Sequence, residues 1–178
     1  MTPANPLLVA YYSRSGNTAR VGHALAQRLG ADELPIEDLR GDGRVSVWRA
    51  ALDRLLGTLP PIADPTVPLE NYDLVVLGTP VWGGRPASPV RRFLHEHAAH
   101  LPRTAFFCTM GGKGSDSTFA EMQERLGRQP RATCAFDAGM IADDGYLDRL
   151  DSFAGQLADG AQPPLNHTHA WNGIHVSG

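Results

Sequence analysis

Short apolar segments alternate with segments of helical periodicity along most of this chain, and this alternation restricts its fold more than any other feature. Residues 7–12 (LLVAYY) and 73–79 (DLVVLGT) are nearly continuous apolar runs, typical of strands covered on both faces. Weaker strand patterns cover residues 31–37, 104–109 and 131–136. Apolar residues at helical spacing predict helices over residues 18–29, 45–56, 88–101, 118–126 and 146–157. The alternation predicts an α/β fold with five strands, a parallel sheet with helices on both faces.

The length of 178 residues fits one domain with one hydrophobic core. We expect this domain to occupy residues 1–160. Residues 161–178 contain Pro163-Pro164, many small residues and no periodicity, so we predict a C-terminal tail. His167 and His169 lie in this tail at a spacing that can bind a metal, but we interpret the segment as a polar tail and predict no metal site.

Charge and hydropathy exclude several classes of partner. The net charge is −3, from 16 basic and 19 acidic residues, and no basic cluster exceeds the pair Arg91-Arg92. We therefore expect binding neither to nucleic acid nor to an anionic membrane. The apolar runs are too short to cross a bilayer, and the N-terminus lacks a signal-peptide pattern, so a cytoplasmic location is expected. Cys108 and Cys134 each lie in an apolar stretch, which favours buried thiols over a disulfide.

Three loops are predicted to follow the carboxyl ends of the strands, where open parallel sheets bind their ligands. They comprise residues 13–18, 80–87 and 110–116, and all three are rich in small, hydroxyl or glycine residues. The third is a glycine- and serine-rich segment after the fourth predicted strand. A ligand site that all three loops share is therefore expected at this edge of the sheet.

The first loop has the composition of an anion site. Backbone N–H groups and the positive end of the following helix would face the anion, while hydroxyl and amide side chains add donors. Gly16 permits the tight turn that such a loop needs. The alternative is a helix cap, because Ser, Asn and Thr are common at helix starts for that reason alone. The loop consists of Ser13, Arg14, Ser15, Gly16, Asn17 and Thr18.

Other phosphate-binding motifs do not fit this sequence. The only Gly-Lys pair is followed by Gly114 rather than by the Ser or Thr of a nucleoside-triphosphate loop. No G-x-G-x-x-G pattern follows the first strand, which excludes the dinucleotide-binding fingerprint. A phosphoacceptor domain of the same topology needs a carboxylate at the end of the third strand, and that position is Thr79.

The second loop places an aromatic side chain among glycines and prolines. Trp82 is either a lid over the core or a stacking surface for a planar ring, and its place beside an anion loop favours stacking. Gly83 and Gly84 allow close approach of the backbone. Arg85 is either a counter-charge for a ligand or a solvated surface residue.

These residues resemble the flavodoxin-like family of FMN-binding proteins, over residues 6–157. The pattern [ST]-x-[ST]-G-[NT]-T matches residues 13–18 at every position, an aromatic-glycine loop matches residues 80–84, and a glycine-rich loop matches residues 111–114. The resemblance implies a flavodoxin-like three-layer sandwich with a five-stranded parallel sheet in the order 2-1-3-4-5. It also implies one non-covalently bound FMN.

The resemblance further implies which residues contact the cofactor. The phosphate would rest on the loop of residues 13–18, and the ring would lie between two other loops. No catalytic side chain is expected, because the cofactor carries the redox chemistry. The residues implied to flank the ring are Pro80, Val81, Trp82, Gly83, Gly84 and Arg85 on one side, and Thr109, Met110, Gly111, Gly112 and Lys113 on the other.

The function that the resemblance implies is electron transfer through FMN, with a redox protein as partner. The alternative is an NAD(P)H-dependent quinone or flavin reductase, with small quinone and nicotinamide substrates; a homodimer is compatible with either. Three departures from typical carriers favour the alternative: the third loop lacks a tyrosine, with Phe119 the nearest aromatic; the chain is near neutral; and Lys113 and Arg85 add positive charge. A binding module that has lost FMN is a third interpretation, against which the intact first loop argues.

Overall fold

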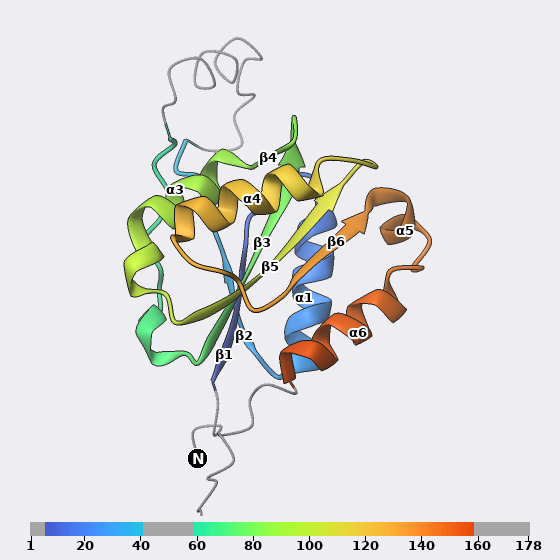
Figure 1. Ribbon diagram of the computed structural model, residues 1–178, viewed down its shortest axis with the longest axis horizontal. Helices are drawn as coiled ribbons and strands as arrows, with labels where there is room; N and C mark the ends of the chain where they lie inside the picture. The colour runs from blue at the N-terminus through green and yellow to red at the C-terminus, as the bar shows by residue number, and fades with distance from the viewer. Residues whose placement is uncertain (1–5, 41–58, 159–178) are drawn as a thin grey trace, which may run out of the picture.

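Five parallel strands form the centre of the protein, whose computed structural model describes residues 6–40 and 59–158 (Figure 1). The strand order is β2-β1-β3-β5-β6, which confirms the predicted order 2-1-3-4-5 when the parallel strands alone are numbered. A short additional strand, β4, pairs antiparallel with the end of β3. The strands are β1 (Leu7–Tyr11), β2 (Asp32–Pro35), β3 (Leu74–Trp82), β4 (Arg85–Pro86), β5 (Arg103–Met110) and β6 (Thr133–Asp137).

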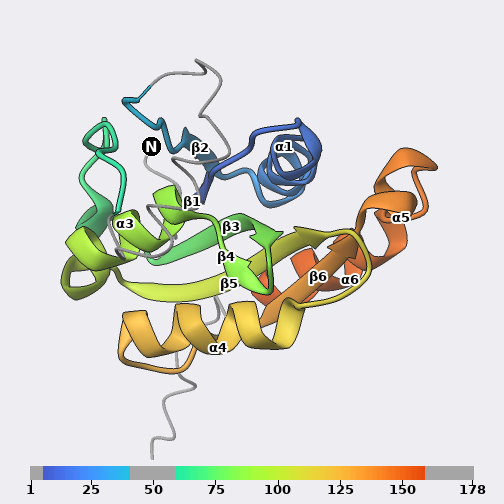
Figure 2. The same cartoon turned by 90° about the horizontal axis from the view of Figure 1, so that it is seen from above.

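Helices cover both faces of this sheet, as the alternation predicts. Strand residues alternate between two hydrophobic clusters: Leu8 and Ala10 of β1 pack with α3 and α4, whereas Val9 and Tyr11 pack with α1, α5 and α6. Seen from above, α1 and α4 lie on opposite sides of the sheet (Figure 2). The helices are α1 (Asn17–Leu29), α3 (Ser88–His97), α4 (Ser115–Leu126), α5 (Ala138–Ala142) and α6 (Leu147–Ala158), with 3-10 turns η1 (Leu69–Asn71) and η2 (Ala98–His100).

The prediction of an irregular loop over residues 80–87 is wrong, because this segment forms a β-hairpin. β3 continues to Trp82, a two-residue turn follows, and β4 returns beside it. The turn residues Gly83 and Gly84 have φ values of 60° and 76°. Two-residue hairpin turns of the type that matches strand twist need positive φ at both positions, which glycine adopts without strain. The pair therefore closes a hairpin and presents Trp82 at its tip.

Three smaller differences concern helices. α4 starts at Ser115, three residues before the predicted start, and the helix predicted to reach residue 101 ends at His97 and continues as a 3-10 turn. The short helix α5 after β6 was not predicted, since it has only five residues; Asp137 caps it by accepting a hydrogen bond from the Gly139 amide at 2.8 Å. The helix predicted over residues 45–56 and the C-terminal tail lie outside the described residues.

Two glycines allow aromatic rings to lie directly on the backbone. A Cβ atom on Gly78, in the central strand β3, would lie 2.1 Å from Cζ of the fully buried Phe107. A Cβ atom on Gly22, in α1, would lie 2.5 Å from Cδ1 of Tyr11. The close contact between α1 and β1 therefore depends on glycine at position 22, and the β3–β5 pairing on glycine at position 78.

The two cysteines are free thiols, as expected, but only Cys108 is buried, whereas Cys134 is partly exposed. Burial raises the pKa of Cys108 to about 12 and that of Cys134 to about 11, so both remain protonated near neutral pH. Within residues 6–40 and 59–158, no helix combines the length and apolarity needed to cross a membrane.

Candidate ligand site at the carboxyl edge of the sheet

The three predicted loops meet at the carboxyl ends of β1, β3 and β5. The hydroxyl oxygens of Thr18, at the start of α1, and Thr109, at the end of β5, are hydrogen-bonded at 2.8 Å, and both residues are buried. The Tyr12 amide donates to the Gly78 carbonyl at 3.2 Å, which holds the first loop beside β3. The first of these contacts joins residues 91 positions apart in the chain, and together the two contacts bring the first loop beside the ends of β3 and β5.

The first loop offers hydrogen-bond donors for which residues 6–40 and 59–158 supply no acceptor. The Ser13 hydroxyl oxygen is buried and has no hydrogen-bond partner in this part of the chain. Gly16 is the N-cap of α1 with φ of 95°, and no side chain caps the helix. Among the described residues, the backbone amides of residues 13–18 donate to no protein group. The interpretation of this loop as an ordinary helix cap therefore fails, whereas an anion would satisfy these donors.

The hairpin tip places Trp82 beside the first loop. The Trp82 side chain is 38% exposed, which excludes a lid buried over the core. The rings of Tyr12 and Trp82 pack edge to face, at a centroid distance of 5.7 Å and an interplanar angle of 89°, and the Arg14 guanidinium carbon lies 5.9 Å from the centroid of the Trp82 ring. These contacts brace the indole and leave aromatic surface accessible.

Arg85 is paired within the protein. Its guanidinium donates two hydrogen bonds to the Glu121 carboxylate, at 2.7 and 3.0 Å. Burial alone raises the pKa of Glu121, but hydrogen bonds from Arg85 and Arg125 and the charge of Arg91 outweigh burial, so the pKa lies below its ordinary value. Arg85 therefore binds a carboxylate of α4, and its contact with a ligand remains a prediction.

The third loop is open and carries no aromatic side chain. Gly111, Gly112 and Lys113 are exposed, and Met110 is partly buried. Phe119, the nearest aromatic in the sequence, belongs to α4 and packs against the core. A Cβ atom on Gly112 would lie 4.0 Å from a carboxylate oxygen of Asp137, so the end of β6 borders the loop.

Four residues of this region are not among the predicted site residues: Tyr12, Ser117, Glu121 and Asp137. The first predicted strand includes Tyr12, yet this residue lies past the end of β1, where its ring contacts Trp82. Ser117 and Glu121 lie one helical turn apart on α4, and their spacing was the only available signal. Their partners lie 33 and 36 residues away along the chain, so no local pattern could reveal them.

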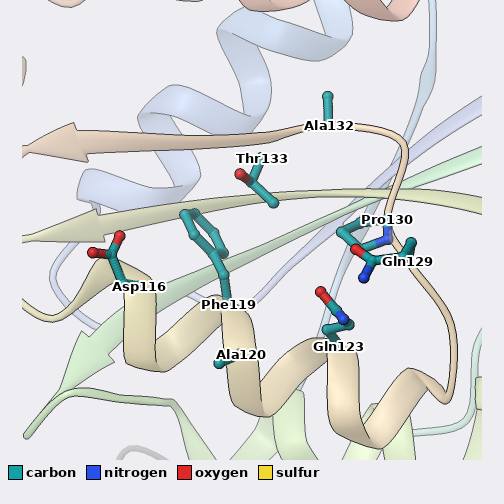
Figure 3. Close-up of a pocket in the computed structure, with 8 residues that line it drawn as sticks. All are labelled: Asp116, Phe119, Ala120, Gln123, Gln129, Pro130, Ala132 and Thr133. Atoms are coloured by element: carbon teal, nitrogen blue, oxygen red, sulfur yellow. The ribbon is translucent and has the colours of Figure 1, made fainter.

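A separate cavity of about 400 Å³ lies between α4 and the segment that enters β6 (Figure 3). No residue of the first loop or the hairpin lines it. Its lining mixes the Phe119 ring with the amides of Gln123 and Gln129. The other lining residues are Asp116, Ala120, Pro130, Ala132 and Thr133.

Among the described residues, no group of three or more His, Cys, Asp or Glu side chains is arranged to hold a metal ion.

Several solved structures that share this fold are flavoproteins or flavodoxins. A flavoprotein from Lactobacillus acidophilus NCFM, solved in complex with FMN, superposes with a TM-score of 0.66 at 24% identity, over 82% of this chain and 98% of that one. A protein from Bacteroides uniformis gives a TM-score of 0.67 at 16% identity, over 85% and 98% of the two chains. Oxidised flavodoxin 2 from Bacillus cereus gives 0.59 at 18% identity, over 87% and 99%.

Comparison at the level of sequence adds nothing to these structural matches. No family model matches this chain, and no curated protein matches it. At identities below 25%, the superpositions show the fold, which is that of flavodoxins. The fold that the sequence motifs imply is therefore confirmed.

Proposed function

We propose that this flavodoxin-fold protein binds FMN non-covalently in the three loops and transfers electrons through it. The observation that carries the proposal is the buried Ser13 hydroxyl oxygen, which, like the backbone amides of its loop, has no hydrogen-bond partner among the residues that the structure describes. A phosphate monoester at this place would accept hydrogen bonds from these donors and interact with the positive end of α1. The similar flavoprotein solved with FMN supports this choice of ligand.

The residues present fit both ends of FMN. The phosphate would be held by Ser13, Arg14, Ser15, Gly16, Asn17 and Thr18. The exposed surface of Trp82, braced by Tyr12, suits a planar ring, and residues 80–85 and 109–113 would hold that ring from two loops. FMN, when bound, supplies the redox centre that accepts and donates electrons. The protein binds and orients it, so no catalytic side chain is needed.

A reductase that uses NAD(P)H and a small quinone or flavin is the second candidate. The third loop carries no aromatic side chain that would cover a ring held against Trp82. Arg14 and Lys113 are exposed at the two sides of the site, where they would attract an anionic substrate. A ring left open on one face is accessible to a second planar molecule, which favours substrate turnover over exchange with a protein partner alone.

The cofactor proposal predicts that the protein prefers FMN to riboflavin. Both share the ring, but only FMN carries the phosphate, so we expect binding at least about 100-fold tighter for FMN, as expected when several charge-assisted hydrogen bonds are added. Titration of the apoprotein, followed by quenching of flavin fluorescence, measures both dissociation constants. Equal affinities would place the phosphate elsewhere, and the absence of saturable FMN binding would refute the proposal.

Steady-state kinetics separate the two candidate functions. The FMN-loaded protein is mixed with NADPH and a benzoquinone, and NADPH oxidation is followed by absorbance. For a carrier we expect no turnover above that of free FMN at the same concentration. Turnover at or above about 1 s⁻¹, the lower end of typical enzyme rates, would instead establish the reductase.

A further inference from the structure

The hairpin that carries Trp82 is too short to hold its own position. Its returning strand β4 pairs with the end of β3 through only two residue pairs, Val81 with Pro86 and Trp82 with Arg85. Pro86 has no backbone N–H group and donates nothing to the ladder. An isolated two-stranded hairpin is marginally stable in water even when it is longer. Contacts outside the hairpin must therefore fix where Trp82 lies.

One stripe of α4 supplies such contacts. Gly114, the N-cap of α4, approaches so closely that a Cβ atom there would lie 3.0 Å from Cα of Gly84. The Ser117 hydroxyl donates to the Gly84 carbonyl at 2.6 Å. Glu121, one turn further along the same face, accepts both hydrogen bonds from Arg85. The first two contacts hold the turn, and the third holds the returning strand β4.

Glu121 itself is held by two further guanidinium groups. Arg125 Nε donates to its Oε1 at 2.9 Å, and Arg91 Nε lies 2.9 Å from the same oxygen. Glu121 and Arg91 are 14% and 13% exposed, so the carboxylate is mostly shielded from solvent. Arg91 belongs to α3 and Arg125 to α4, and both residues position the carboxylate. Arg85 is the one member of this group that belongs to the hairpin.

We propose that Glu121 is a positioning residue that, through the forked hydrogen bond to Arg85, holds the Trp82 hairpin in the conformation that accepts the flavin. This inference rests on the proposed FMN function. Without the clamp, the hairpin would sample other positions, and FMN binding would have to order it again. The free energy needed to order the hairpin would weaken the binding of every flavin, with or without a phosphate. The reason is that the hairpin would contact the ring, whereas the phosphate would be bound by the first loop.

Glu121→Gln tests the proposal, with Glu96→Gln as its matched control. The amide of glutamine keeps the shape of the side chain but turns an N–H group toward a guanidinium donor, so the fork breaks. Glu96 forms an ion pair with Arg92 on α3, away from the hairpin, so its variant also loses one ion pair. We expect Glu121→Gln to weaken FMN and riboflavin binding about tenfold each, and Glu96→Gln to leave both unchanged within about twofold.

Hydrogen exchange of the apoproteins gives a readout besides flavin binding. Peptides that span residues 81–87 should exchange faster in Glu121→Gln than in the wild type, while peptides of β1 and β5 keep their protection. Unchanged exchange together with unchanged affinity would overturn the positioning role, while FMN binding by the wild type would still stand. A wild-type protein that binds no FMN would refute the proposed function, and the inference with it.

Two further variants keep the test decisive if Glu121→Gln does not fold. Arg85→Gln removes the guanidinium group by which the hairpin binds Glu121. The Glu121 carboxylate keeps its ion pairs with Arg91 and Arg125, so it is not left unpaired. We expect the same loss of flavin affinity, about tenfold, because one charged hydrogen-bonded pair is broken in both variants. The double variant should bind no more weakly than the weaker single variant, whereas additive losses would show that Glu121 does not act through Arg85.

Discussion

Replacement of Ser15 by aspartate is expected to weaken FMN binding by roughly 100-fold or more, because the new carboxylate would repel the phosphate. Ser15 is exposed and lies one residue before the N-cap of α1, within the loop proposed to hold the phosphate. Two like charges about 4 Å apart repel by about 4 kcal/mol at an effective dielectric constant of 20, and solvent near the loop reduces this value. Fluorescence titration of the apoprotein measures the change.

The same substitution should not weaken the fold, which distinguishes it from a folding defect. A carboxylate near the N-terminus of a helix interacts favourably with the helix dipole, by about 0.3–1 kcal/mol. The melting temperature of the apoprotein should therefore stay constant or rise slightly. Ser15→Asn, of the same size but neutral, is the matched control and should keep most of the affinity. If Ser15→Asp binds FMN as tightly as Ser15→Asn does, the phosphate does not lie in this loop.

Replacement of Gly78 by alanine is expected to destabilise the apoprotein by about 3 kcal/mol, at the upper end of the usual cost of overpacking a core. The added Cβ atom would lie 2.1 Å from Cζ and 2.3 Å from Cε1 of the Phe107 ring. That ring is fully buried between the sheet and the helices, and Gly78 lies in the central strand, so neither group can move freely. For a protein of this size the melting temperature should fall by about 6–12 °C.

Gly155→Ala is the matched control for this prediction. Gly155 is exposed on α6, and a Cβ atom there would meet nothing within 4 Å. Alanine is favoured over glycine inside a helix by about 0.5–1 kcal/mol, so this variant should be slightly more stable than the wild type. Thermal unfolding followed by circular dichroism compares the two variants. A Gly78→Ala protein that melts within one or two degrees of the wild type, a range of about 0.5 kcal/mol, would contradict the packing argument.

The sheet and the loops at its carboxyl edge could be predicted because they depend on local patterns. Residues 7–11 and 74–77 are buried strands in the structure, as their apolar runs predict. The loop of residues 13–18 was identified from its own composition and position. The hairpin was not, because Pro80 and the two glycines are typical of irregular loops, while the strand pairing depends on the φ values of Gly83 and Gly84.

The network around Glu121 could not be predicted from spacing alone. Arg85 had two open interpretations, ligand counter-charge or surface residue, and the structure gives it a third role in an ion pair with α4. Which role Arg85 takes depends on which face of α4 contacts β4. That face could not be predicted, because α4 begins three residues earlier than its apolar periodicity predicts. Its first turn contains polar residues that carry no periodic signal, although Ser117 contacts Gly84 there.

The succession of strands and helices along the chain, most of the core, and the loop that offers hydrogen-bond donors to an anion follow from local patterns in the residues. Hydrophobic periodicity and turn chemistry act over a few residues and can be recognised locally. Only the folded chain shows that Thr18 meets Thr109, that Tyr12 and Arg14 contact Trp82, and that Glu121 pairs with the hairpin. These contacts join residues that are 36 to 91 positions apart along the chain. They form only when the sheet brings the carboxyl ends of its strands together.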